Sequence, residues 1–554
     1  MKKMMLLIPV VSIFLFLNTP LAAEVNDQEW HGYWRWRLGV DEPFESVSYG
    51  EGNKFFNPLY LYNKTRFWQG EKYNLGFVLR KGRNEPSITW DNAGKYYLIK
   101  YYFQMQKVLV DKIIIGTYQL QYNQGLVFYY PFSEINRPVK IEAGGIDKDT
   151  GTNPNAYFSG IAAEHKYKDF DLAAFYSHKL LDASLNKDGT VKSDLVTIRD
   201  DYGYIQSPAD LKKRNTLRSE MIGGRVAYNF LPKTHFGLIA YRNRYTPRIN
   251  PPASKGEYLF RGDKNTVYGW DFATTINKVE LVSEFAQSEG HGQGWLIQPM
   301  LHLNKLRLWS AAYKYDRDYY NEYSSALTTD ELDEDINEEG MKVGLEYKYK
   351  KWRFQTHFDR ARHPDKGDNL GPTRVEVLWF ETYYRPVKGV ELYFRQWNKW
   401  YDEKTKLSGT GIYKDLYQSW RKTRLEGIWE PNEQFRFKTR YEYRVDTIYE
   451  LKQVNNGFLV FEDIRYTVTK GLTIQGRFIY FEAPEVYLSE LEPIWKNTYV
   501  SYYWNTRGTG LRYYLMADQQ ISRHSHLWLK YENTRKTSSN SPTDALKLQY
   551  DWAW

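Results

Sequence analysis

The chain has 554 residues, no cysteine and a formal net charge of +9 at pH 7, and 26% of its residues are charged. Without cysteine, disulfides and thiolate metal sites are excluded. Aromatic residues make up 17% of the chain, although its mean hydropathy is only -0.67. A transmembrane β-barrel combines these properties, because aromatic girdles flank its apolar outer band while its lumen stays polar. A secreted all-β sugar-binding protein with aromatic platforms is the competing interpretation.

The N-terminal segment is typical of a secretory signal peptide. Lys2 and Lys3 precede an apolar run over residues 4–17, and small residues follow at Ala22 and Ala23. This run is shorter than the ~20 residues that a spanning helix needs. We therefore predict a signal peptide over residues 1–23 and one outer-membrane barrel domain over 24–554. Because only about six residues would then precede the first strand, we expect no separate plug domain ahead of the barrel.

From Trp30 onward one unit repeats: about ten alternating apolar and polar residues, a tight turn, about ten more, and a longer polar loop. The tight turns include 167–169, 231–233, 277–278, 304–305, 386–388 and 469–471. The longer loops are 40–57, 82–95, 131–157, 181–217, 244–263, 315–338, 361–371, 398–413, 445–456 and 534–544. The pattern predicts an all-β fold class, a single large transmembrane antiparallel β-barrel with short periplasmic turns and long extracellular loops.

The number of strands follows from the number of alternating segments, which is about 25. A barrel with both chain ends in the periplasm requires an even number. We leave out the run from Tyr499 to Trp504, because Pro484 and Pro493 precede it and a glycine-rich turn at 507–510 follows it. The prediction is then about 24 strands, in a range of about 22 to 26, with residues 499–504 in an outer loop.

Five segments share features with a known family. They are GTYQLQYNQGL at 116–126, YFSGIAA at 157–163, LAAFYSHKLLDA at 172–183, GTGLRYYL at 508–515 and LWLKY at 527–531. In this order and spacing, the chain resembles the barrel portion of Bacteroidota-type outer-membrane proteins that usually carry helix-hairpin-helix repeats before the barrel. The resemblance implies a porin-like outer-membrane β-barrel.

This sequence departs from the family pattern in two ways, which limit what can be transferred from the family to this chain. No helix-hairpin-helix segment precedes Trp30, so a DNA-binding role attached to those repeats does not transfer. Thr117 and Asn123 stand where the family favours an acid and a glycine-type turn residue. The family supplies no chemistry that can be assigned to a particular residue of this chain.

Residues on the predicted inward face are the candidate functional residues, and basic side chains dominate them. The pore-lining candidates are Lys342, Lys348, Arg353, Arg395, Arg424, Arg436, Lys438, Arg440, Arg444 and Arg477. A wet pore lined in this way favours anions, because low-dielectric walls focus the field of the fixed charges. In the alternative, these bases pair with acids on neighbouring strands and only keep the lumen wet. We predict a porin-like diffusion channel for small polar, preferably anionic, solutes.

Two other segments invite functional hypotheses. Residues 181–218 form the longest loop, which folds either inward as a constriction or outward as a receptor surface. An acidic run contains Asp330, Asp333 and Asp335, whose carboxylates suggest a Ca²⁺ loop. This run lacks the glycine and the ligand spacing of an EF-hand, so a solvated loop is the simpler interpretation and we predict no metal site.

We predict no enzymatic activity and no cofactor. The segment from His524 to His526 places Ser525 between two imidazoles, but no third group orients them as nucleophile and base. The second class of function is an outer-membrane binding or assembly protein, whose loops hold polysaccharide, DNA or a partner protein. Aromatic side chains could stack sugars or bases there, although a membrane-interface girdle is the simpler interpretation; they are Trp397, Trp400, Tyr401 and Trp420.

The last segment, from Leu546 to Trp554, alternates apolar with polar or small residues and ends in an aromatic. Tyr550, Trp552 and Trp554 resemble the C-terminal signal recognised by the outer-membrane insertion machinery. We therefore predict localisation in the bacterial outer membrane. The expected partners are outer-membrane lipid, lipopolysaccharide, the assembly machinery and small polar solutes. We do not expect nucleic acid, and the sequence leaves the oligomeric state open.

Overall fold

The computed structural model describes residues 29–41, 59–81, 98–122, 124–128, 144–151, 157–192, 212–253, 258–325, 327–328, 337–364, 374–406, 413–505, 508–538 and 542–554. The predicted signal peptide lies outside these ranges. Within them, no helix is long and apolar enough to cross a membrane.

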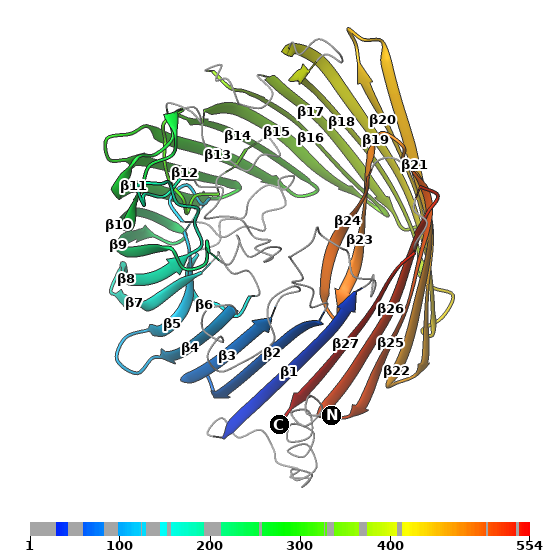
Figure 1. Ribbon diagram of the computed structural model, residues 1–554, viewed down its shortest axis with the longest axis horizontal. Helices are drawn as coiled ribbons and strands as arrows, with labels where there is room; N and C mark the ends of the chain where they lie inside the picture. The colour runs from blue at the N-terminus through cyan, green and yellow to red at the C-terminus, as the bar shows by residue number, and fades with distance from the viewer. Residues whose placement is uncertain are drawn as a thin grey trace.

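The named elements are all β-strands (Figure 1). The first nine are β1 (Trp30–Asp41), β2 (Leu59–Gln69), β3 (Tyr73–Lys81), β4 (Leu98–Gln106), β5 (Lys112–Gln121), β6 (Gly145–Lys148), β7 (Phe158–Tyr167), β8 (Phe170–Leu181) and β9 (Leu217–Leu231). The next nine are β10 (Thr234–Ile249), β11 (Gly262–Ile276), β12 (Val279–Ser288), β13 (Gln293–Leu303), β14 (Leu306–Tyr315), β15 (Glu338–Tyr349), β16 (Trp352–Arg362), β17 (Arg374–Tyr384) and β18 (Val390–Lys406). The last nine are β19 (Tyr413–Trp429), β20 (Phe435–Ile448), β21 (Gln453–Thr469), β22 (Leu472–Glu482), β23 (Tyr487–Trp495), β24 (Thr498–Asn505), β25 (Thr509–Ser522), β26 (Ser525–Lys536) and β27 (Thr543–Ala553).

A 24-strand antiparallel barrel closes on itself. Neighbours along the chain pair around the wall, and the wall passes from β5 to β7 and from β22 to β25. β1 pairs with β27 from Tyr33 opposite Ala553 to Asp41 opposite Ala545, which closes the ring. The predicted fold class and the predicted strand number of about 24 are therefore confirmed.

Three strands lie outside the wall. β6 extends the sheet only beside the end of β5, where Tyr118 lies opposite Lys148. β23 and β24 form a separate antiparallel hairpin, and Figure 1 shows it inside the ring. The run 499–504 is thus not a wall strand, as predicted, but it folds into the barrel as part of this hairpin.

The chain ends and the short turns share one end of the barrel. Backbone hydrogen bonds of 3.0 Å join Gly32 to Trp554 at this end. The turns after β7, β11 and β15 have positive φ at Lys168 (55°), Asn277 (55°) and Lys350 (51°). Tight hairpins need such φ values, because their turns follow the right-handed twist of the flanking strands. The predicted division into short turns and longer connections follows from this arrangement.

Several predicted loops are shorter than expected, including 445–456, 398–413, 244–263 and 534–544. β20 ends at Ile448 and β21 begins at Gln453, so four residues replace the predicted loop 445–456. β18 and β19 stay paired as far as Lys406 opposite Tyr413, well inside the predicted loop 398–413. Polar residues near these strand ends are typical of loops in the sequence. In the structure they continue the backbone pairing of neighbouring strands beyond the apolar part of each strand.

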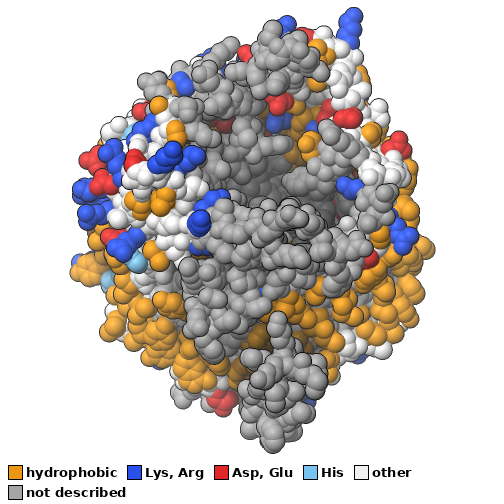
Figure 2. Space-filling view, viewed as in Figure 1, with side chains coloured by type: hydrophobic (Ala, Val, Ile, Leu, Met, Phe, Trp, Pro, Cys, Tyr) orange, Lys and Arg blue, Asp and Glu red, His pale blue; other side chains and the backbone are white. Residues whose placement is uncertain are grey.

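The two faces of the wall differ as the alternation predicts. In β15, Met341 and Val343 are 47% and 48% exposed, whereas Lys342 between them is 1% exposed. Aromatic rings stack on the outer surface near the short turns, as in Trp352 with Tyr384, whose centroids lie 4.0 Å apart. Figure 2 shows a belt of apolar side chains along the lower left and the lower right of this view. A closed barrel with such a belt and girdle spans a membrane, which places the chain in the bacterial outer membrane.

Candidate functional site

The candidate site is the lumen, on the side of the wall opposite the apolar belt. The ten predicted pore-lining residues all occupy inward positions of β15, β16, β18, β19, β20 and β22. They are not equally enclosed: the side chain of Lys342 is 1% exposed and that of Lys348, near the short turns, is 67% exposed. Alternation therefore identified the correct face of each strand.

Each of these ten bases lies within ion-pair distance of an acid. The pairs are Lys342–Asp359 (3.2 Å), Lys348–Glu346 (3.2 Å), Arg353–Glu381 (3.6 Å), Arg395–Glu442 (3.9 Å), Arg424–Glu426 (3.6 Å), Arg436–Glu430 (3.2 Å), Lys438–Glu426 (2.7 Å), Arg440–Glu426 (2.6 Å), Arg444–Asp446 (2.6 Å) and Arg477–Asp463 (2.8 Å). Because opposite charges pair along and across strands, the lumen is polar without being uniformly positive.

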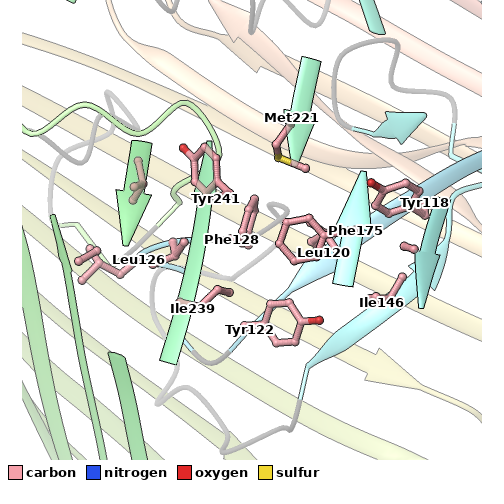
Figure 3. Close-up of a cluster of buried hydrophobic side chains, with 14 of the residues drawn as sticks. Tyr118, Leu120, Tyr122, Leu126, Phe128, Ile146, Phe175, Met221, Ile239 and Tyr241 are labelled. Carbon is pink, nitrogen blue, oxygen red and sulfur yellow. The ribbon is translucent and has the colours of Figure 1, made fainter. Parts of the chain in front are cut away.

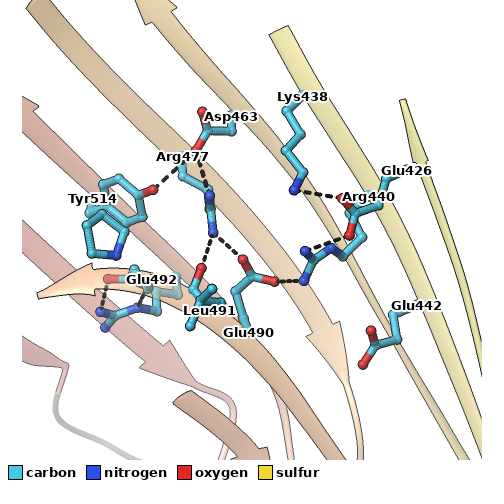
Figure 4. A network of polar contacts seen from close by, with 12 residues as sticks. Glu426, Lys438, Arg440, Glu442, Asp463, Arg477, Glu490, Leu491, Glu492 and Tyr514 are labelled. Carbon is cyan, nitrogen blue, oxygen red and sulfur yellow. Dashed lines mark hydrogen bonds and ion pairs between the residues drawn. The ribbon is translucent and has the colours of Figure 1, made fainter. Parts of the chain in front are cut away.

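The hairpin β23–β24 is anchored to this charged wall through two carboxylates (Figure 4). Glu490 pairs with Arg440 of β20 and Arg477 of β22, and it is 1% exposed. Glu492 is 0% exposed and pairs with Arg512 of β25 and with Lys530 of β26. The ammonium group of Lys530 also donates to the carbonyl oxygen of Pro493 at 2.8 Å. Four wall strands thus hold one inserted hairpin.

Apolar contacts hold the base and the tip of the hairpin. Near its base, Val486 and Leu488 pack with inward residues of β21 and β22, including Phe461 and Phe481. At its tip, Trp495 stacks on Tyr60 of β2 with a centroid distance of 5.6 Å. The hairpin therefore reaches across the inner face from β21 and β22 to the beginning of the wall.

The tip of the hairpin lies toward the end of the barrel that carries the short turns. Lys496 contacts Asp518 of β25 at 3.0 Å and His526 of β26 at 2.7 Å. These two residues flank the turn that connects β25 to β26. The hairpin leaves the wall after Glu482 of β22 and rejoins it at Thr509 of β25, and these two residues pair at the end of the barrel away from the short turns. The hairpin therefore runs through much of the depth of the lumen.

A second insertion fills the lumen beside β4 to β14 with apolar side chains (Figure 3). Residues 124–128 leave β5 and place Phe128 against Phe175 and Tyr241, with ring centroids 5.3 and 4.8 Å apart. The amide of Leu126 donates to the Glu284 carboxylate at 3.2 Å, and the side chain of Asn321 donates to the carbonyl oxygen of Leu126 at 2.8 Å. Residues 319–325 thus pack with the insertion and satisfy its buried backbone.

The predicted long loop is described over residues 181–192 and 212–218. Val191 forms a parallel bridge with Ile249 at the end of β10, and it is fully buried beside Tyr245 and Leu217. The hydroxyl and amide groups of Thr190 donate to Asp188 at 2.7 and 3.0 Å and lower the pKa of that carboxyl. These parts of the loop pack on the ends of wall strands. Residues 193–211 of this loop lie outside the described residues, and the described segments that enter the lumen are β23–β24, 124–128 and 319–325.

The remaining sequence hypotheses have different outcomes. Asp330, Asp333 and Asp335 lie outside the described residues, and among those that are described no group of three His, Asp or Glu is placed to hold a metal. Ser525 hydrogen-bonds the hydroxyl of Ser522 at 2.8 Å rather than an imidazole.

The aromatic candidates lie on strands rather than in a loop. Trp397 and Trp420 meet edge to face on the inner wall, with centroids 4.8 Å apart. Trp400 and Tyr401 also belong to β18, and side chains alternate in direction along a strand. The aromatic residues considered as a loop platform around residues 398–413 thus belong to the barrel wall.

The C-terminal aromatic residues lie at the closure of the barrel. Trp554 packs edge to face on Phe67, with ring centroids 5.7 Å apart, and its ring lies 4.6 Å from that of Trp552. Tyr550 lies opposite Trp36 in the pairing of β27 with β1. Their role in membrane insertion stays a prediction.

Comparisons with known proteins give structural likenesses only. No protein-family model matches the chain, and no curated protein matches it. The copper transporter OprC is similar over 96% of this chain and 82% of its own, with 9% identity and a TM-score of 0.47. The FrpB iron transporter from Neisseria meningitidis (F3-3 variant) matches 96% of this chain and 83% of its own, with 9% identity and a TM-score of 0.42. Pseudomonas aeruginosa OpdK with vanillate matches 61% of this chain and 93% of its own, with 10% identity and a TM-score of 0.29. We draw no functional conclusion from these likenesses.

Proposed function

We propose that the chain is an outer-membrane channel for small polar solutes and that the β23–β24 hairpin limits the passage. A closed barrel of this size has a lumen too wide for wall side chains to fill. Residues 124–128 and 319–325 occupy the lumen on one side, where the packing is apolar. The observation that carries the proposal is the charged, ion-paired lining of β15 to β22 on the other side.

A paired lining suits polar solutes because it offers donors and acceptors at fixed positions. Buried polar groups cost free energy unless they are satisfied, so such a lining is not expected where only packing is needed. Arg424, Arg440 and Lys438 converge on the carboxylate of Glu426, which gives this part of the wall more bases than acids. We expect a modest preference for anions, because the pairs cancel most of the field of the individual bases.

Solute flux and ion selectivity test this proposal. Liposomes containing the purified protein are expected to admit small organic anions faster than cations of the same size. In a salt gradient, the reversal potential is expected to have the sign of anion preference and to shrink as salt rises, because salt screens charges beyond a Debye length of roughly 8 Å. Flux that favours cations would contradict the anion preference, and an absence of flux would contradict the channel.

A binding or assembly protein is the second candidate, and the inserted segments favour it. The contacts of Phe128 and the pairs of Glu492 fill lumen space that an open pore would leave to water. A barrel that is folded yet impermeable to every solute tested would support this function. Its ligand would then be sought among polysaccharides, DNA and partner proteins applied to the extracellular side.

A further inference from the structure

Four basic side chains form a patch on the outward surface, just above the apolar belt. They are Arg218 of β9, Arg242 and Arg244 of β10, and Lys264 of β11, and all are exposed. We call these four residues the outer basic patch. Figure 2 shows many Lys and Arg side chains, with Asp and Glu side chains among them, at the left margin above the belt, where Figure 1 places β9 to β11.

The strand register brings these side chains together. Arg244 lies directly opposite Lys264, and Arg242 precedes it by two residues on the same face of β10. Directly opposite residues have Cβ atoms about 5 Å apart, and next neighbours along one face lie about 7 Å apart. Arg218 lies opposite Thr246, two residues beyond Arg244. A single phosphate group is therefore within reach of several of these long side chains.

Within the described residues, the acids near the patch do not form ion pairs with its bases. No side-chain hydrogen bond or ion pair joins any of the four bases to another residue in the part of the chain that the structure describes. Glu220 lies opposite Arg244, but its carboxylate is 3.9 Å from the imidazole of His178 instead. These bases are therefore available to an external anion.

Bases at the outer ends of β16 and β17 provide a contrast. Arg362 pairs with Glu339, and both Arg360 and Arg374 pair with Glu376. These arginines face outward like those of the patch, but acids of the same surface already balance them. A general need for outward positive charge does not explain why, among the described residues, the bases of one group form ion pairs and those of the other do not.

The height of the patch on the wall points to the membrane surface. β10 begins at Thr234, beside the exposed Leu231, and Leu238 faces lipid below Arg242. Eight residues of strand span roughly 26 Å, or roughly 20 Å of membrane thickness at a tilt near 40°. An outward apolar band is about 25 Å tall, and an arginine extends its charged group toward the interface. The guanidinium groups therefore reach the level of the outer-leaflet headgroups.

We propose that the outer basic patch binds the phosphate groups of lipid A, the glycolipid anchor of the outer leaflet. Guanidinium groups match phosphate oxygens in charge and geometry, and their paired hydrogen bonds are strong. The apolar belt below accepts the acyl chains of the same molecule, which a free phosphate cannot use. The proposal holds whether or not the lumen conducts solutes.

Lipid binding by the folded protein tests the proposal. The purified protein in detergent is titrated with lipid A, and binding is followed by native mass spectrometry and by the temperature at which the folded barrel loses its anomalous gel mobility. The test variant is R242Q/R244Q/K264Q. The matched control is R360Q/R362Q/R374Q, which removes three outward bases that already have acidic partners.

Lipid A is expected to bind the wild-type protein and the control with similar affinity, and the test variant about tenfold or more weakly. Dephosphorylated lipid A is expected to bind the wild-type protein about tenfold or more weakly than lipid A does. This comparison does not depend on the folding of any variant. Equal affinity for the two lipids, or equal losses in the two triple variants, would overturn the proposal. Saturable protection by inorganic phosphate alone would also overturn it, because the site would then not be specific for the lipid.

Discussion

Arg512 of β25 and Glu492 of the hairpin form a two-pronged ion pair, in which the Nε and Nη2 atoms of Arg512 donate to the two carboxylate oxygens at 2.9 and 2.6 Å. This geometry fixes both the distance and the orientation of the partners. Both residues are almost fully buried, and each has a further charged partner, Glu532 for Arg512 and Lys530 for Glu492. Because Glu492 is the acid that both Arg512 and Lys530 contact, one substitution there can weaken the docking of the hairpin.

We expect Glu492→Gln to loosen the hairpin. The change leaves Arg512 and Lys530 without one of their acidic partners, at a cost of about 2 to 4 kcal/mol in hairpin docking. Trypsin is then expected to cut after Lys496 in the folded barrel, which protein mass spectrometry would detect. Glu430→Gln is the control, since Glu430 pairs with Arg436 in a short turn away from the hairpin. Equal protection of Lys496 in both variants would mean that the pair does not hold the hairpin.

We expect the second insertion to depend on Asn321. Asn321→Ala removes donors to the carbonyl oxygens of Leu126 and Val127, and a buried acceptor left unsatisfied costs about 1 to 3 kcal/mol. Hydrogen exchange at the amides of residues 124–128 should become faster. The control is Asn229→Ala, whose side chain contacts Asp171 near a short turn. Unchanged exchange in Asn321→Ala would show that the remaining contacts, such as that of the Leu126 amide with Glu284, hold the segment without Asn321.

The membrane-facing belt predicts an asymmetry between two exposed apolar residues. Leu238 lies on the outward face of β10, whereas Val387 lies in the short turn between β17 and β18. Leu238→Arg is expected to destabilise the barrel by about 2 to 4 kcal/mol in lipid, because it places a charge in the hydrocarbon. Val387→Arg is expected to change the free energy of unfolding by less than about 0.5 kcal/mol. The free energies of unfolding are measured by urea titration of the liposome-inserted protein. Similar losses in the two variants would mean that Leu238 does not face the hydrocarbon.

Closure of the barrel is expected to depend on the small size of Gly32. A Cβ atom at this position would lie 2.0 Å from the indole of Trp554, so Gly32→Ala displaces that ring from the junction of β1 and β27. Overpacking of this kind costs about 1 to 3 kcal/mol. The folded fraction after refolding, read from gel mobility, should fall. Gly427→Ala is the control because its nearest side-chain atom, on Leu392, is 4.0 Å away; an equal loss there would exclude this explanation.

The wall could be predicted from the sequence because its alternation has a period of two residues. Met341 and Lys342 differ so clearly in hydropathy that the face of β15 follows from the order of residues alone. The aromatic residues near the short turns, such as Trp352 and Tyr384, mark one interface in the same local way. These signals lie within single strands and need no knowledge of distant partners.

The contents of the lumen could not be predicted in this way. β23 alternates like a wall strand, and only its pairs with distant residues, such as Glu492 with Arg512, place it inside. The same holds for the apolar residues Leu126 and Phe128, which pack against strands far along the chain. For the pore-lining bases, alternation gave the face, whereas the strand register, which brings Lys342 opposite Asp359, decides which acid neutralises each base.

Single-channel conductance in a planar bilayer tests most directly whether the hairpin limits passage through this barrel. The wild-type protein and the variant E490Q/E492Q are compared at equal salt, with Glu430→Gln as control. We predict steady openings in the wild-type protein and the control, and larger openings in the double variant, because its hairpin no longer binds Arg440, Arg477, Arg512 and Lys530. Openings of equal size in all three proteins, or none in any of them, would contradict the proposed function.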